Sequence, residues 1–137
     1  MGYEHPTQDE LKRILTDSKR IAIVGISDKP DRASYQVAAY LQNAGYEIIP
    51  INPRLNEVLG VKAYKSLEEV EGEIDIVDVF RRSEETPPVA EAAVAAGAKL
   101  LWLQLGIAND EAYTIAHEAG VQVIMDRCIK IDHATLL

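Results

Sequence analysis

The chain alternates between short apolar runs and longer segments in which apolar and polar residues mix. A short apolar run bounded by glycine or polar residues is typical of a strand that is buried on both faces of a sheet. Such runs predict five strands, at residues 21–24, 47–51, 74–80, 100–104 and 121–125. The segments between them repeat apolar residues at helical spacing, so the sequence predicts strands that alternate with helices.

Polar residues at fixed offsets mark where several of these helices begin. Residues 7–10 read Thr-Gln-Asp-Glu, a capping box that predicts the first helix, and residues 66–69 repeat the pattern as Ser-Leu-Glu-Glu. Ser34 is the candidate cap of the second helix, and Asn109 is the candidate cap of the last long one. These signals place each expected helix between two expected strands.

The alternation predicts one α/β domain over residues 1–137, with a Rossmann-like three-layer architecture. A five-stranded parallel sheet would carry helices on both faces, and we expect the strand order 3-2-1-4-5 along the chain. Residues 1–18 are expected to form an N-terminal helix that packs on this domain. Asp75 and Asp78 lie within the third strand, which suggests an edge position, with Asp78 paired to a neighbouring loop.

Composition narrows the class of protein. With 47% hydrophobic and 26% charged residues, the chain has the balance of a globular domain. A net charge of −8 argues against nucleic acid and anionic membranes as partners, because both need clustered basic residues. The single cysteine, Cys128, excludes an internal disulfide framework and favours a reducing, cytoplasmic location.

Basic residues nevertheless gather where the predicted strands end. Carboxyl ends of parallel strands meet at one edge of a sheet, which is where ligands bind in open α/β folds. A positive edge on an acidic protein predicts a small phosphorylated ligand at that edge. Seven of the 14 Lys and Arg residues follow strand ends: Lys29, Arg32, Arg54, Arg81, Arg82, Arg127 and Lys130.

The turn after the first strand refines the type of ligand. Gly25 allows a tight turn before a helix whose free amides favour a pyrophosphate. The turn is not a GxGxxG fingerprint, because Ser27 takes the place of the second glycine and no third glycine follows. The second strand ends in Asn52, Pro53 and Arg54, where a dinucleotide site would place an acid for the ribose hydroxyls. NAD is therefore disfavoured, and Arg54 suits the additional phosphate of NADP or coenzyme A.

An ordered set of short motifs carries a family resemblance. The motifs are Gly25–Ser27, Ile51–Pro53, Gly60–Tyr64, Ser66–Leu67, Val79–Arg82, Trp102–Ile107 and Asp126–Cys128. With this set the chain resembles the small CoA-binding protein family, which is similar to the N-terminal domain of the succinyl-CoA synthetase α subunit. The likeness covers roughly residues 14–131.

The resemblance implies that the protein binds coenzyme A, or an acyl-CoA, at the carboxyl edge of the sheet. NADP or NAD is the alternative cofactor, for a sensor or an oxidoreductase, and a regulatory subunit of a separate acyl-CoA enzyme is a third interpretation. The strand ends and the resemblance together give these candidate cofactor-binding residues: Gly25, Ile26, Ser27, Lys29, Arg32, Ser34, Asn52, Pro53, Arg54, Phe80, Arg81, Arg82, Gln104 and Gly106.

Catalytic residues are not recognisable in the sequence, and neither is a metal-ligand spacing. The synthetase phosphorylates a histidine in a second domain and works with a nucleotide-binding subunit, and neither part is recognisable here. We therefore expect coenzyme A binding without catalysis, and no CoA ligase activity from the isolated chain. His5 and His117 are expected to be solvated, and Cys128 is expected to be a packing residue. The sequence assigns no protein partner.

Overall fold

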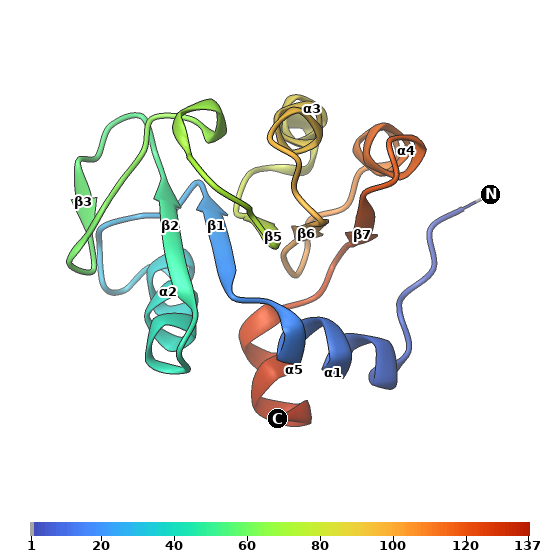
Figure 1. Ribbon diagram of the computed structural model, residues 1–137, viewed down its shortest axis with the longest axis horizontal. Helices are drawn as coiled ribbons and strands as arrows, with labels where there is room; N and C mark the ends of the chain where they lie inside the picture. Colours follow the sequence, from blue (N-terminus) through green and yellow to red (C-terminus); the bar gives the residue numbers. More distant parts are fainter. Residues whose placement is uncertain (1) are drawn as a thin grey trace.

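The computed structural model of the protein describes residues 2–137, and its centre is a five-stranded parallel sheet (Figure 1). The strands pair in the order β2-β1-β5-β6-β7. Their bounds are β1 (Arg20–Val24), β2 (Glu47–Ile51), β5 (Ile76–Val79), β6 (Leu100–Leu103) and β7 (Gln122–Ile124). Four of the five strands fall within the runs that the sequence predicts, and β1 begins one residue before its run, at Arg20.

Helices cover both faces of the sheet, which confirms the predicted three-layer α/β class. Figure 1 shows one layer of helices below the sheet and another above it. The lower layer holds α1 (Gln8–Asp17), α2 (Ala33–Asn43) and α5 (Ile129–Leu136). The upper layer holds α3 (Thr86–Ala95) and α4 (Asp110–Glu118), with the short turns η1 (Leu67–Glu69) and η2 (Ser83–Glu85). A small hairpin of β3 (Glu57–Val58) and β4 (Val61–Lys62) lies beside β2.

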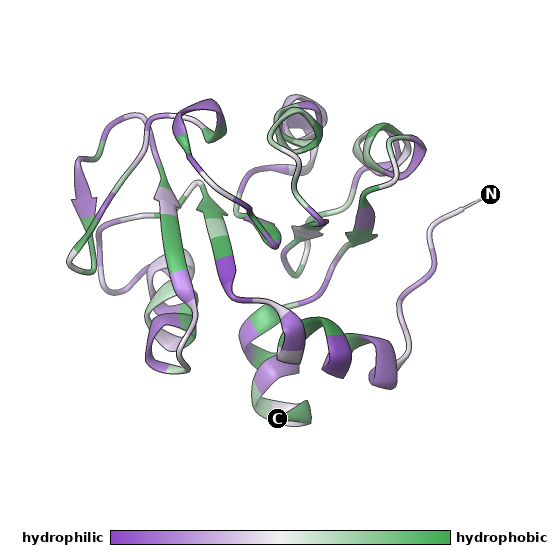
Figure 2. Cartoon of the chain, viewed as in Figure 1, coloured by the Kyte–Doolittle hydropathy of each residue, from purple (hydrophilic) through white to green (hydrophobic). Residues whose placement is uncertain are grey.

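Strict alternation along the strands divides the core into two apolar layers. Ile21, Ile23 and Trp102 belong to the apolar layer between the sheet and the helices α1, α2 and α5. Ala22 and Val24 belong to the layer between the sheet and the helices α3 and α4. Figure 2 shows the central strands largely green, while the helices carry both colours. The strands are therefore buried on both faces, as continuous apolar runs require.

The predicted strand order 3-2-1-4-5 is wrong, because the third predicted strand, β5, pairs with β1 and β6 instead of lying outside β2. The outer edge of β2 is taken by the segment after the β3–β4 hairpin. Tyr64 donates its N–H to the carbonyl of Pro50 at 2.8 Å and accepts from the N–H of Asn52 at 2.9 Å. Hydropathy alone did not distinguish the two orders, since both bury the same runs.

The two acids of the third strand are consequently not at an edge. Asp75 lies at the amino end of β5 and accepts hydrogen bonds from the N–H groups of Lys19 and Arg20, and it pairs with Lys99 at 3.2 Å. Asp78 lies in the middle of the sheet between Ile23 and Trp102, with no exposed surface and no hydrogen-bond partner. The expected pairing of Asp78 with a loop is therefore wrong.

Two of the predicted helix caps form and two do not. Thr7 and Glu10 make the reciprocal bonds of the capping box, and Asn109 accepts from the N–H of Ala112. Ser34 lies inside α2 and does not cap it, and Ser66 makes no side-chain cap for η1. Over residues 2–137, no helix has the length and apolar character that crossing a membrane requires.

Candidate functional site

The observed strand order places a topological switch between β1 and β5. The chain leaves β1 toward the lower layer through α2, and it leaves β5 toward the upper layer through α3 (Figure 1). Connections that diverge in this way leave a crevice beyond the carboxyl ends of the two strands. The predicted site residues after β1 and β5 therefore lie on opposite sides of one crevice, even though the predicted strand order was wrong.

Gly25 is the point at which the two sides touch. Its φ is +86°, and a Cβ atom there would overlap the carbonyl oxygen of Phe80 and lie 3.4 Å from Cδ of Arg81. The N–H of Gly25 also donates to the carbonyl of Ile51, and the N–H of Phe80 donates to the carbonyl of Val24. A residue without a side chain is needed here because the ends of β1, β2 and β5 converge.

The loop between β1 and α2 is held in shape by two serines. Ser34 accepts from the N–H of Ser27 at 2.9 Å, and the hydroxyl of Ser27 accepts from the N–H of Lys29 at 3.0 Å. Arg32 takes the N-cap position of α2, with no side-chain cap and no acid in the first helical turn. An uncapped helix start carries free N–H groups and partial positive charge, which suits a bound anion.

At the end of β2, both polar groups of the Asn52 side chain are hydrogen-bonded within the protein. Its amide donates to the carbonyl of Ile26 at 2.7 Å, and its side-chain oxygen accepts from the N–H of Arg54 at 2.8 Å. Asn52 therefore positions the loop that follows β1, while Pro53 and Arg54 are exposed at the strand end.

A hollow of about 190 Å³ opens between the ends of β1 and β2, the turn η1 and the start of α3. We call it the edge hollow. Its walls are mostly apolar, and Arg81 and Lys65 bring two cations to it. The lining residues are Val24, Ile51, Lys65, Ser66, Leu67, Arg81, Pro88, Val89 and Ala92. Lys65 and Ser66 were not among the sequence candidates, because residues 66–69 were assigned to a helix cap.

The predicted positive edge is divided into a free half and a neutralised half. Around the switch point, five cations have no carboxylate within 4 Å among residues 2–137: Lys29, Arg32, Arg54, Lys65 and Arg81. Further along the edge Arg82 and Arg127 are paired, while Lys130 lies over the ring of Tyr40. Arg82 lies 2.9 Å from Glu85, and Arg127 makes two bonds of 2.7 Å to Asp132. Free positive charge is therefore concentrated at the crevice.

Gln104 and Gly106 lie on the neutralised half, after β6. Gln104 is buried, and its side-chain oxygen accepts from the N–H of Ile129 at 3.2 Å. The N–H of Gly106 donates to the carboxylate of Asp126 at 2.7 Å. Both predicted contacts thus already have partners within the protein, and the structure does not bring these two residues to the crevice.

Two reactive groups of the sequence have different surroundings. Burial raises the pKa of Asp78 well above its usual range and so favours the neutral carboxyl group, and the lack of exposed surface keeps it away from ligands. Cys128 is half-buried at the N-cap of α5 and lines a second hollow, at the ends of β6 and β7. No group of three His, Cys, Asp or Glu residues within the described chain could hold a metal ion.

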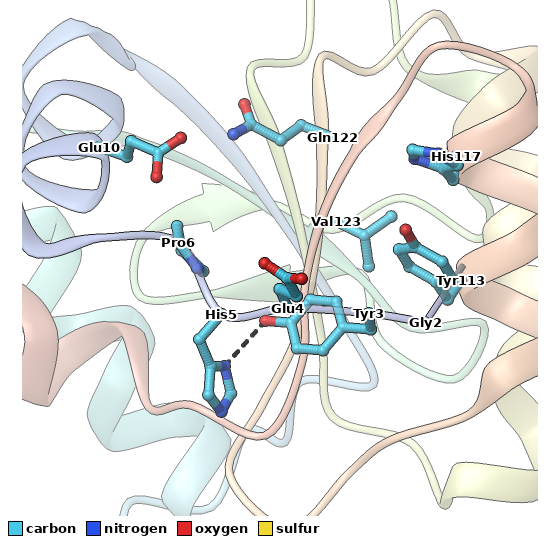
Figure 3. Close-up of a pocket in the computed structure, with 10 residues that line it drawn as sticks. All are labelled: Gly2, Tyr3, Glu4, His5, Pro6, Glu10, Tyr113, His117, Gln122 and Val123. Atoms are coloured by element: carbon cyan, nitrogen blue, oxygen red, sulfur yellow. Dashed lines mark hydrogen bonds between the residues drawn. The ribbon is translucent and has the colours of Figure 1, made fainter.

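A larger hollow of about 420 Å³ lies far from the crevice, where residues 2–6 cross the open side of β7 (Figure 3). The hydroxyl of Tyr3 accepts from the N–H of Met125 at 2.9 Å and is 3.0 Å from Nδ1 of His5. His5 and His117 are exposed, as expected. Sequence reasoning had no signal for this contact, since it joins residues 122 positions apart.

Comparisons with known proteins show the family and the fold of the chain. The model of a family described as CoA binding domain matches residues 19–134. Uncharacterized protein YneT of Bacillus subtilis is 55% identical over 96% of this chain and 97% of its own length. The α subunit of acetate–CoA ligase [ADP-forming] II of Pyrococcus furiosus is 30% identical over 85% of this chain, which spans only 28% of that subunit. A hypothetical protein from Pyrococcus horikoshii superposes with a TM-score of 0.93 at 38% identity, over 99% of both chains.

Proposed function

Because the chain belongs to the CoA binding domain family, we propose that it binds coenzyme A or an acyl-CoA in the crevice between β1 and β5. The observation that carries the proposal is the division of the positive edge. Five unpaired cations surround the crevice, whereas Arg82 and Arg127 beyond it are neutralised by carboxylates. Coenzyme A carries a pyrophosphate and a further phosphate, and unpaired arginines are the side chains that bind such groups most strongly.

The uncapped start of α2 is the proposed place of the pyrophosphate. Its free N–H groups and the adjacent Arg32 would face the phosphates, with Gly25 allowing the chain to approach closely. The edge hollow is the proposed place of the adenine, because Val24, Ile51 and Leu67 give it apolar walls. Arg81 would then lie between these two parts of the ligand, since its Cδ is 3.4 Å from where a Cβ atom of residue 25 would be and it also lines the edge hollow.

We propose that this chain binds its ligand without catalysis of its own. The residues that line the edge hollow include no carboxylate, imidazole or thiol. In the hollow at the ends of β6 and β7, Asp132 is bonded to Arg127 and Asp126 accepts from the N–H of Gly106. General acid–base chemistry needs a group that gains or loses a proton near neutral pH and lies within reach of the ligand. The ligase relative has a subunit more than three times as long, so its activity and partners are not carried over here.

The first expected result is selectivity for coenzyme A over nicotinamide nucleotides. Ser27 in place of the second glycine and Asn52 in place of a ribose-binding acid should weaken NAD and NADP, while the unpaired cations favour coenzyme A. Isothermal titration calorimetry should give tighter binding of coenzyme A than of NAD, NADP or ADP. At 100 times its Kd, coenzyme A should stabilise the fold by about 2.7 kcal/mol. Tighter binding of NAD would contradict the proposal and leave the fold description intact.

The second expected result separates Arg81 from its neighbour Arg82. Replacing Arg81 with alanine should weaken coenzyme A binding by about 10- to 100-fold, because a charge-assisted bond to phosphate contributes about 1.5–3 kcal/mol. Arg82→Ala is the matched control, since Arg82 is exposed and already paired with Glu84 and Glu85. Titration of both variants should show a large loss for the first and a small one for the second. Equal losses would move the phosphate site away from the crevice.

A further inference from the structure

The hollow at the ends of β6 and β7 has an unusual combination of exposed apolar side chains and satisfied charges. We call it the β6–β7 hollow. It measures about 170 Å³ and is lined by Leu105, Asp126, Arg127, Cys128, Ile131 and Asp132. Leu105 is 63% exposed and Ile131 is 56% exposed, and together with Leu137 they are the exposed large hydrophobic residues of the described chain. Two of the three therefore flank one hollow.

The one cation of this hollow is already paired. Arg127 and Asp132 form a bidentate pair, and Asp126 accepts from the N–H of Gly106. A ligand that entered the hollow would find no free cation, and it would cover the side chains of Leu105 and Ile131. Burial of apolar surface is then the main source of binding free energy at this place.

The β6–β7 hollow lies on the same edge of the sheet as the proposed coenzyme A site. Neighbouring strands are about 4.8 Å apart, so three spacings separate the β1–β2 end of the edge from the β6–β7 end, about 14 Å in all. The pantetheine arm of coenzyme A contains two amide units and a terminal ethyl thiol, and it is long enough to cross this distance. Ser83, between the two places, fixes the loop after β6 by accepting from Ala108 and Asn109.

We infer that the ligand is an acyl-CoA with a short acyl group, and that this group lies in the β6–β7 hollow against Leu105 and Ile131. The inference rests on the proposed function and names the class of ligand for that site. A water molecule in the liquid occupies about 30 Å³, so the hollow holds a group of about five or six heavy atoms. That volume suits an acyl chain of two to about five carbons and is too small for a fatty acyl chain.

A series of ligands tests the inference on the whole chain. Calorimetric titration should show that acetyl-CoA binds more tightly than coenzyme A, and that butyryl-CoA binds more tightly still. Each methylene that becomes fully buried should improve the affinity by up to about fourfold. Octanoyl-CoA should gain nothing over butyryl-CoA, because its chain extends beyond the hollow. Equal affinity for coenzyme A and butyryl-CoA would overturn the inference.

Variants of the two apolar residues locate the effect. Leu105→Ser and Ile131→Ser should remove most of the preference for butyryl-CoA and leave the affinity for coenzyme A unchanged. Both side chains are more than half exposed, so the core keeps its packing. Leu137→Ser is the matched control, because Leu137 is equally apolar and 50% exposed but lines a hollow with Leu15 and Tyr46 elsewhere. A preference that survives both substitutions would place the acyl group elsewhere and overturn the inference.

The same titrations distinguish this inference from the proposed function. If coenzyme A and butyryl-CoA both fail to bind, the proposed function fails, and the inference fails with it. If coenzyme A binds and the acyl group adds nothing, only the inference fails. Loss of both affinities in Leu105→Ser would also contradict it, because that result assigns Leu105 to the coenzyme rather than to the acyl group.

Discussion

Alanine in place of Gly25 is expected to lower the free energy of unfolding by about 3 kcal/mol or more and to abolish coenzyme A binding. Two effects add here. A φ of +86° strains an L-residue by about 1–2 kcal/mol. The new Cβ would also overlap the carbonyl oxygen of Phe80. That oxygen belongs to the backbone, and the N–H of Phe80 is bonded to Val24, so the overlap can be relieved only by separating the ends of β1 and β5.

Gly120→Ala is the control for the conformational part of this effect. Gly120 has nearly the same φ, +82°, and a Cβ there would meet no atom within 4 Å. Urea unfolding followed by circular dichroism gives the stability of both variants, and titration gives their affinity for coenzyme A. Gly120→Ala should lose only the strain energy and should keep its affinity. Equal losses of stability in the two variants would show that the contact with Phe80 is unimportant.

The second large effect is a pH dependence that comes from Asp78. Its folded pKa is raised by burial above the ordinary value of 3.8, so the folded protein holds a proton that the unfolded chain releases. The contribution of Asp78 to stability is therefore full below about pH 4 and falls as pH rises toward its folded pKa. The slope is about 1.4 kcal/mol for each pH unit within that window.

Asp78→Asn removes the titration while keeping the shape of the side chain. Urea unfolding measured from pH 5 upward should give a difference between native protein and variant that grows in favour of the variant until the pH passes the folded pKa of Asp78. His133, whose pKa is lowered by burial, loses stability as pH falls below 6.5, but it does so in both proteins and cancels in the difference. Asp78→Val should be more stable than the native protein at neutral pH, because no polar group is left unpaired. A difference that does not change with pH would contradict the neutral carboxyl.

Local patterns in the sequence were sufficient for the five strands of the main sheet and the helices between them, but they did not predict the β3–β4 hairpin. The capping box of Thr7 and Glu10 and the cap by Asn109 form as predicted, since each depends on residues a few positions apart. Ser34 fails as a cap because the loop before α2 turns its hydroxyl toward the N–H of Ser27. The competing donor is the N–H of Ser27, and N-cap propensities do not take such a neighbouring donor into account.

The position of β5 in the sheet and the choice of unpaired cations could not be predicted from the sequence, because both depend on contacts between residues far apart in the chain. The position of β5 depends on the segment around Tyr64, which covers β2, and on Asp75, which joins β1 to Lys99 before β6. Contacts between distant elements also decide which predicted site residues are free to bind a ligand. Arg81 and Arg82 are adjacent and chemically alike, yet only Arg82 has carboxylates within reach. Which cation stays free is set by the fold and not by the motif.

The segment that bears Tyr3 has a consequence for aggregation. An edge strand with unpaired backbone groups is a template on which another chain can add a strand. One edge of this sheet is covered by Tyr64, and at the other edge the hydroxyl of Tyr3 takes the N–H of Met125, directly after β7. A tyrosine-bearing segment thus covers each edge of the sheet. A form of the protein that lacks residues 1–5 and begins at Pro6 would lose the contact of Tyr3. We expect the sheets of such molecules to pair edge to edge into fibrous assemblies.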